Sequence, residues 1–152
     1  DKTELIHNLL NLITETYKLF MEEWVKFVPF ENNYSTHWSM LIKGNIMLRD
    51  DSAMNLSPEM FDEFIKPYDG RLLKIFNGGG IHFCGRGDHY IEKLSEIEGV
   101  YAINMSQPGY NDMEKILKNT VDKGIKIIGL SRETSEELKK KGRDLKKSIQ
   151  SF

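Results

Sequence analysis

The chain has 152 residues, of which 39% are hydrophobic and 29% are charged, so it can build one ordinary hydrophobic core. Its 21 basic residues nearly balance 23 acidic residues, and the sequence has no basic stripe of the kind that binds nucleic acid. No segment approaches the roughly 20 apolar residues of a membrane span, and one cysteine forms no internal disulfide. We therefore expect a single domain over residues 1–152 of a cytoplasmic protein, with neither nucleic acid nor a membrane as partner.

The first predicted element is a long amphipathic helix over residues 3–27. Apolar side chains recur there at helical spacing, from Leu5 to Trp24, with Glu and Lys residues between them. Pro29 ends the pattern, and "VPFENNYSTHWS" around and after it shows no period, which predicts a polar, aromatic loop. The chain enters this helix almost directly from Asp1, as an excised piece of a longer protein would.

Four strand–helix units are predicted after this loop. We expect the strands at 45–51, 79–85, 99–109 and 125–133, and the helices that follow them at 56–68, 90–97, 111–122 and 134–151. Ser57 as N-cap and Pro58 at the first helical position mark the start of the first of these helices, and Gly124 follows the third. Because short loops join the units, the sequence predicts an α/β fold with a parallel sheet and right-handed crossovers.

Polar residues gather where the predicted strands end, and ligands of parallel sheets bind at the carboxyl ends of the strands. Asp50 and Asp51 end the first strand. They act there as an acid, a base or a metal ligand, or they only form a solvated turn. The third strand ends in neutral groups that suit the polar atoms of a small-molecule substrate: Asn104, Ser106, Gln107 and, unless it merely packs, Tyr110.

The second strand carries the only cysteine, in "IHFCG". Side chains two apart on a strand share a face, so His82 and Cys84 project together while Ile81 and Phe83 point to the other side, toward the helices. Imidazole and thiolate suit zinc, but a catalytic zinc usually takes three protein ligands and only two are visible. The alternative interpretation is that both residues only pack in the core.

Three segments carry a resemblance to a known family: "LRDDSAMNLSPEMFDEFIKPYDGRLLKIF", "IHFCGRGDHYIEKL" and "GVYAINMSQPGYNDMEKI". They resemble the carboxyl-terminal half of the uroporphyrinogen decarboxylase superfamily, which includes cobamide-dependent methyltransferases, and the likeness covers roughly residues 1–132. It implies a partial (β/α)8 barrel of the TIM type, with about the last four strand–helix units preceded by a long helix. A complete barrel takes about 250 residues, so we expect a missing amino-terminal half or a homo-oligomer to complete the fold.

The methyltransferase branch implies a zinc ion held by His-x-Cys and a later cysteine, which activates a thiol for methylation by a methylcorrinoid. His82 and Cys84 match the first two ligands, whereas the later region "IIGLSRE" offers Ser131 and no thiol. The third ligand is therefore Asp50, Asp51 or another side chain, or there is none; in a further role, one of these aspartates orients His82. This branch also implies a corrinoid protein as partner, and it is the function that we expect.

The decarboxylase branch implies different chemistry, with no metal and no cofactor. In this alternative, a carboxylated tetrapyrrole is bound by His82, Asp50 and Arg86, and the Arg86 guanidinium pairs with a substrate carboxylate. A third alternative is that the chain is an inactive half-barrel that self-associates, so that only its parent protein is an enzyme.

Overall fold

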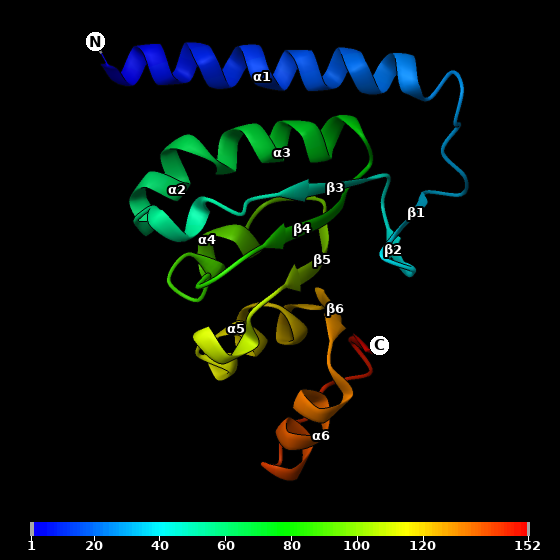
Figure 1. Ribbon diagram of the computed structural model, residues 1–152, viewed down its shortest axis with the longest axis vertical. Helices are drawn as coiled ribbons and strands as arrows, with labels where there is room; N and C mark the ends of the chain where they lie inside the picture. Colours follow the sequence, from blue (N-terminus) through cyan, green and yellow to red (C-terminus); the bar gives the residue numbers. More distant parts are fainter. Residues whose placement is uncertain (1, 152) are drawn as a thin grey trace.

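The computed structural model describes residues 2–151, which form an α/β fold around a five-stranded parallel sheet (Figure 1). The strands lie side by side in chain order: β3 (Ile46–Arg49), β4 (Gly79–Phe83), β5 (Val100–Met105), β6 (Lys126–Leu130) and β7 (Ile149–Ser151). The helices are α1 (Lys2–Trp24), α2 (Pro58–Phe64), α3 (Lys66–Ile75), α4 (Ile91–Ser95), α5 (Met113–Asn119) and α6 (Arg132–Lys140). Short 3₁₀ turns are η1 (Ala53–Asn55), η2 (Pro108–Tyr110) and η3 (Val121–Lys123). The predicted parallel α/β sheet is confirmed.

The helix after β3 starts where the sequence predicts. The hydroxyl of Ser57 accepts a hydrogen bond from the backbone N–H of Met60 at 3.2 Å, and Pro58 is the first helical residue. A second helix, α3, begins at once, and its Pro67 stands in the first turn, where a missing N–H costs nothing. The predicted helix is thus two helices, α2 and α3, that reach Ile75.

The predicted loop after α1 is wrong, because residues 34–43 form an antiparallel hairpin. Its strands are β1 (Tyr34–His37) and β2 (Met40–Lys43), joined by a two-residue turn. Trp38 and Ser39 in that turn have φ of 46° and 64°, the left-handed backbone of a type I′ turn. Such turns favour Asn and Gly. Because Trp and Ser occupy this turn, the sequence gives no signal of a hairpin.

The predicted last helix, 134–151, is also wrong in its second half. Helix α6 ends at Lys140, Gly142 takes a left-handed φ of 83°, and Ile149–Ser151 becomes strand β7, parallel to β6. The many charged residues of this segment suggested a solvated helix, whereas its few apolar residues, among them buried Leu145, anchor a turn and an edge strand. The sheet therefore has five strands where the sequence predicted four.

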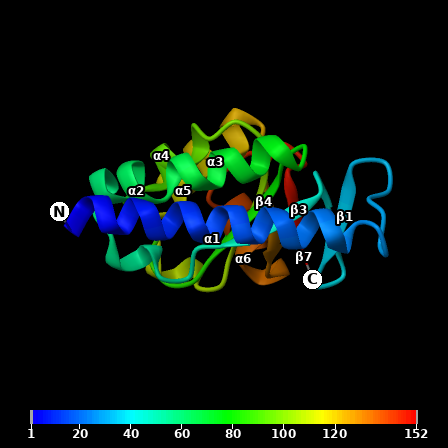
Figure 2. The same ribbon diagram turned by 90° about the horizontal axis from the view of Figure 1, so that it is seen from above.

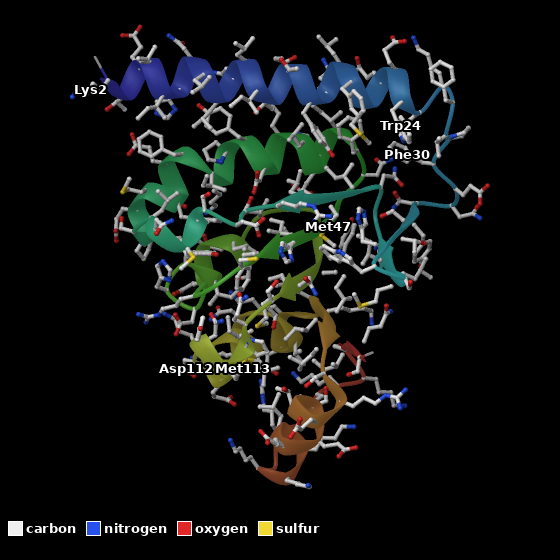
Figure 3. The ribbon with its side chains drawn as sticks, viewed as in Figure 1. Lys2, Trp24, Phe30, Met47, Asp112 and Met113 are labelled. Carbon is white, nitrogen blue, oxygen red and sulfur yellow. The ribbon has the colours of Figure 1, made fainter. Side chains whose placement is uncertain are left out.

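The two faces of the sheet are covered differently. On one face, Ile46, Ile81, Phe83, Ile103 and other fully buried side chains pack against helices α2 to α5 in the main core. On the other face, a smaller cluster joins the hairpin to the sheet: Met40, Ile42, Met47, Ala102 and Ile128. Met47 marks this second cluster in Figure 3.

Helix α1 runs alongside α3 at the edge of the molecule (Figures 1 and 2). Its inner side is attached by the Tyr17 ring, edge-on to Phe76, and by a hydrogen bond of 2.7 Å between His7 Nδ1 and the Tyr68 hydroxyl. Its outer side leaves large apolar side chains exposed, among them Leu5, Leu9, Leu12, Phe20 and Trp24. Within residues 2–151, none of the helices combines the length and apolar character that a membrane crossing needs.

Candidate metal centre

Three potential metal ligands converge at the carboxyl ends of β3 and β4. The carboxylate of Asp51, the imidazole of His82 and the thiol of Cys84 each offer an atom, and these atoms all lie within 4.8 Å of one another. His82 Nε2 is 3.0 Å from Asp51 Oδ1 and 3.5 Å from Cys84 Sγ. The predicted convergence of His82 and Cys84 on one face of a strand is confirmed, and Asp51 joins them.

Strand alternation separates Asp51 from its neighbour Asp50. Odd-numbered Met47 lies in the hairpin cluster and even-numbered Leu48 in the helix-side core, so consecutive side chains at the end of β3 point to opposite faces. Asp51 accordingly reaches His82, and Asp50 turns toward Asp69 of α3. Of the two aspartates that the sequence left open, Asp51 is the one placed as a ligand.

Asn104 on β5 holds the His82 ring. Strand register places Asn104 directly opposite His82, and the distance from His82 Nδ1 to Asn104 Oδ1 is 2.6 Å. The amide of Asn104 also donates from Nδ2 to the carbonyl of Ile128 at 2.7 Å. Since both ends of this buried amide are hydrogen-bonded within the protein, Asn104 is a positioning residue here, and its predicted contact with a substrate stays a prediction.

The Asn104 amide also determines which imidazole nitrogen of His82 carries a proton. Because Nδ2 donates to Ile128, Oδ1 is the acceptor, and His82 Nδ1 must donate its N–H to it. The neutral ring then has a lone pair on Nε2, directed at a carboxylate oxygen and a sulfur. A proton on Nε2, the S–H of Cys84 or a metal ion would each satisfy this arrangement.

Gly129 makes the close approach of Asn104 possible. It has φ of 73°, at an irregularity in the pairing of β6 with β7, and a Cβ there would lie 2.5 Å from Asn104 Nδ2. A side chain at this position would push the amide away from the Ile128 carbonyl. The glycine is therefore required for the alignment of His82.

The hairpin turn supplies a wall of the site. The Trp38 ring centroid lies 5.1 Å from that of His82, and the Arg49 guanidinium lies 4.5 Å from the Trp38 centroid. A hollow of about 520 Å³ opens at this point, within the size range of small-molecule pockets. Its lining residues are Trp38, Met40, His82, Asn104, Met105, Ser106 and Gly129.

Asp50 and Asp69 form a buried carboxyl pair on the helix side of the metal centre. Burial, with the nearby negative charge of Asp51, raises the pKa of Asp50 to about 6. Burial, with the charge of Asp50, raises the pKa of Asp69 well above its usual value. The hydroxyl of Tyr90, also buried, has no hydrogen-bond partner within residues 2–151. The raised pKa values favour a proton on this pair, which lies beside the three potential metal ligands and is not one of them.

The other predicted site residues lie in the loops beside the centre. Ser106 Oγ is 3.4 Å from Cys84 Sγ, and Gln107 Oε1 accepts from the Gly85 backbone N–H at 2.6 Å. Tyr110 on η2 is 69% exposed. Arg86 donates from Nε to Asp88 Oδ1 at 2.6 Å, so its charge is already matched within the protein. Ser106 thus borders the metal ligands, and Gln107 fixes the loop after β4.

Sequence reasoning missed three residues of this site. Trp38 was placed in a loop without period, and Gly129 in a strand interior carried no signal beyond being glycine. Asn111 accepts hydrogen bonds from the backbone N–H groups of Gly87 and Asp88 with its side-chain oxygen, and thereby orders the loop beside Cys84. The sequence predicted Asn111 as the first residue of the helix over 111–122, and nothing there marked it as part of a site.

Comparison of the chain with family models, with curated proteins and with solved structures found no match.

Proposed function

We propose that Asp51, His82 and Cys84 bind a zinc ion with one coordination position open for a thiol substrate. The observation that carries this proposal is the convergence of His82 Nε2, the Asp51 carboxylate and the Cys84 sulfur within 4.8 Å, while Nδ1 of His82 is bonded to Asn104. Thiolate, imidazole and carboxylate are the ligand types that zinc prefers, and three protein ligands with an open fourth position are the usual catalytic set. The site supplies one of each.

The ligand atoms lie near the separations that this ion needs. Zinc–ligand bonds of about 2.0–2.3 Å in a tetrahedron place neighbouring ligand atoms about 3.3–3.8 Å apart. The separation of Nε2 from Sγ is 3.5 Å, inside this range, whereas Asp51 Oδ1 is 3.0 Å from Nε2 and all three atoms lie within 4.8 Å of one another, so Asp51 must rotate to complete the geometry. The exposed Asp51 is free to make such a rotation, whereas His82 is buried and fixed by Asn104.

Each residue then has a defined task. Asn104 presents Nε2 of His82 as a ligand, and the hydrogen bond to Nδ1–H increases the basicity of the ring. Ser106 places its hydroxyl beside the Cys84 sulfur, and Trp38 covers the His82 ring from the hairpin side. Zinc bound there would lower the pKa of a substrate thiol and so supply a thiolate at neutral pH.

We infer further that the acceptor thiol takes a methyl group from a corrinoid, as in the methyltransferase branch of the uroporphyrinogen decarboxylase superfamily that the sequence resembles. The whole enzyme would be a (β/α)8 barrel of which this chain supplies the later strands. The open edges of β3 and β7 and the exposed apolar side of α1 support a chain that pairs with more protein, either an amino-terminal half or another copy.

Metal-independent decarboxylation of a tetrapyrrole draws less support. That alternative needs Arg86 and Asp50 to meet a carboxylated substrate together with His82. Arg86 is bonded to Asp88, and Asp50 turns to the helix side toward Asp69. Neither side chain has a contact with His82 among the hydrogen bonds and ion pairs of residues 2–151.

The test uses zinc-loaded protein and a small thiol. We expect binding of the thiol at neutral pH to release a proton, measured by titration calorimetry in buffers of different ionisation enthalpy. Zinc-free protein and the variant His82→Ala should show neither binding nor proton release. His37→Ala, which removes a nearby histidine outside the three ligands, serves as the matched control and should behave as the unaltered protein. If the zinc-loaded protein does not bind thiols, the proposal is wrong.

A further inference from the structure

A second hollow lies at the opposite end of the sheet from the metal centre. It has a volume of about 470 Å³, in the size range of small-molecule pockets, and is bordered by the amino-terminal residues of β5 and β6 and by strand β2. The hairpin connects the two regions: its Trp38 turn lies beside His82, whereas Lys43 at the far end of β2 lines this second hollow. We call it the basic cavity, because of the residues described next.

Three lysines line the basic cavity without any acidic residue among its lining: Lys43, Lys126 and Lys147. None of the three forms an ion pair with a carboxylate in residues 2–151. The neighbouring Lys146 shows the contrast, since its Nζ lies 2.7 Å from Asp122 Oδ1. Like charges around one hollow repel one another, and a bound anion would remove that repulsion.

One of the charges is held in place. Lys43 Nζ lies 4.3 Å from the centroid of the Tyr101 ring, a cation–π distance that fixes the ammonium at the cavity wall. Lys147 is presented by a strained backbone, since Lys146 and Lys147 both have left-handed φ values, 49° and 54°. Consecutive non-glycine residues in this region cost free energy and tend to mark functional sites.

The rest of the lining is apolar or aromatic. Ile42, Ala102 and Ile128 form a buried floor that continues the hairpin cluster, and Tyr34 is half exposed at the rim. A ligand that satisfies both parts of the lining has a negatively charged group for the lysines and an apolar or aromatic body for the floor. Inorganic ions meet only the first requirement.

We propose that the basic cavity is a binding site for a small organic anion, a molecule that joins a phosphate or carboxylate group to an apolar body. This site is separate from the metal centre, since it lies at the amino-terminal ends of the strands and shares no lining residue with the hollow beside His82. It does not depend on the proposed zinc chemistry.

The test titrates the protein with phenyl phosphate, benzoate and neutral benzyl alcohol and follows the amide signals of Tyr101, Lys126, Lys147 and Gln150 by NMR. We expect phenyl phosphate, benzoate or both to shift these signals, and benzyl alcohol to shift them least. Whichever anion binds more tightly identifies the charged group as a phosphate or a carboxylate. Affinity should fall as ionic strength rises.

The triple variant Lys43→Gln, Lys126→Gln, Lys147→Gln should weaken anion binding by about tenfold or more. The matched control changes three exposed lysines elsewhere to glutamine, namely Lys74, Lys118 and Lys140, and should leave the affinity unchanged. The proposal fails if neither anion shifts the cavity signals. It also fails if both triple variants weaken binding equally, because the effect would then come from overall charge.

Discussion

The two faces of strand β4 show how one short segment serves packing on one side and chemistry on the other. Ile81 and Phe83 are fully buried in the main hydrophobic core, on the side that the helices cover. His82 and Cys84 point the other way, toward Asp51, Asn104 and a hollow. Because side chains alternate along a strand, a change at one position affects either stability or the site, and seldom both. The following predictions test this separation, from the largest expected effect to the smallest.

The packing face should dominate stability. Replacing Phe83 with alanine removes a fully buried ring and should lower the free energy of unfolding by about 3–5 kcal/mol. The adjacent change Cys84→Ala, which alters a half-buried side chain at the site, should cost less than about 1.5 kcal/mol. Urea denaturation measures both. Equal losses from the two variants would mean that the faces are not separable.

The site face should dominate metal binding. Cys84→Ala and His82→Ala should each weaken zinc binding by more than about a hundredfold, since a lost ligand costs more than a lost outer partner. Competition with a chromophoric chelator measures this affinity. Phe83→Leu, which keeps the packing face apolar, is the matched control and should bind zinc as the unaltered protein does. Retention of tight zinc binding in either ligand variant would rule out this centre.

Asp50, which points to the opposite face from Asp51, should make the free energy of unfolding depend on pH. Its pKa rises from 3.8 to about 6 on folding, so the folded state binds more protons than the unfolded state between these values. The free energy of unfolding should therefore fall as pH rises through this range, by about 2–3 kcal/mol, and then level off. Asp50→Asn should remove this component of the pH dependence, as measured by urea denaturation from pH 4 to 8. An unchanged profile in the variant would show that Asp50 is not protonated in the fold.

Asn104 should affect the affinity for zinc indirectly, through its hydrogen bond to His82. Asn104→Ala leaves Nδ1–H of His82 without its acceptor, and zinc affinity should fall by about 10–100-fold. Asn104→Asp retains an acceptor oxygen and should restore most of the affinity, which a purely structural role would not explain. If both variants lose affinity to the same extent, the tautomer of His82 is not set by this contact.

Much of this arrangement could be predicted from the sequence because it follows from local alternation. The shared face of His82 and Cys84, the capping of α2 by Ser57 and the alternation of strands with helices all depend on residues close together in the chain. Alternation puts Asp50 and Asp51 on opposite faces of β3, but which of them meets His82 depends on which face the hairpin covers and which face the helices cover. No local pattern contains that information.

The remaining differences come from contacts between distant segments. The hairpin has a turn of Trp38 and Ser39 that local preferences disfavour, and its burial against Met47 and Ile128 stabilises it. Strand β7 gains its pairing from β6, although its own segment is highly charged. The bond of Asn104 to His82 depends on register between β4 and β5, which the sequence of neither strand specifies.

The most direct test of the metal centre is the absorption spectrum of the protein after addition of Co²⁺, which occupies zinc sites and reports its ligands. We predict one equivalent of tightly bound Co²⁺, with a sulfur-to-metal charge-transfer band and the intense visible bands of tetrahedral geometry, and loss of the charge-transfer band in Cys84→Ser. A spectrum of six-coordinate Co²⁺ without the charge-transfer band, unchanged by Cys84→Ser, would contradict the account.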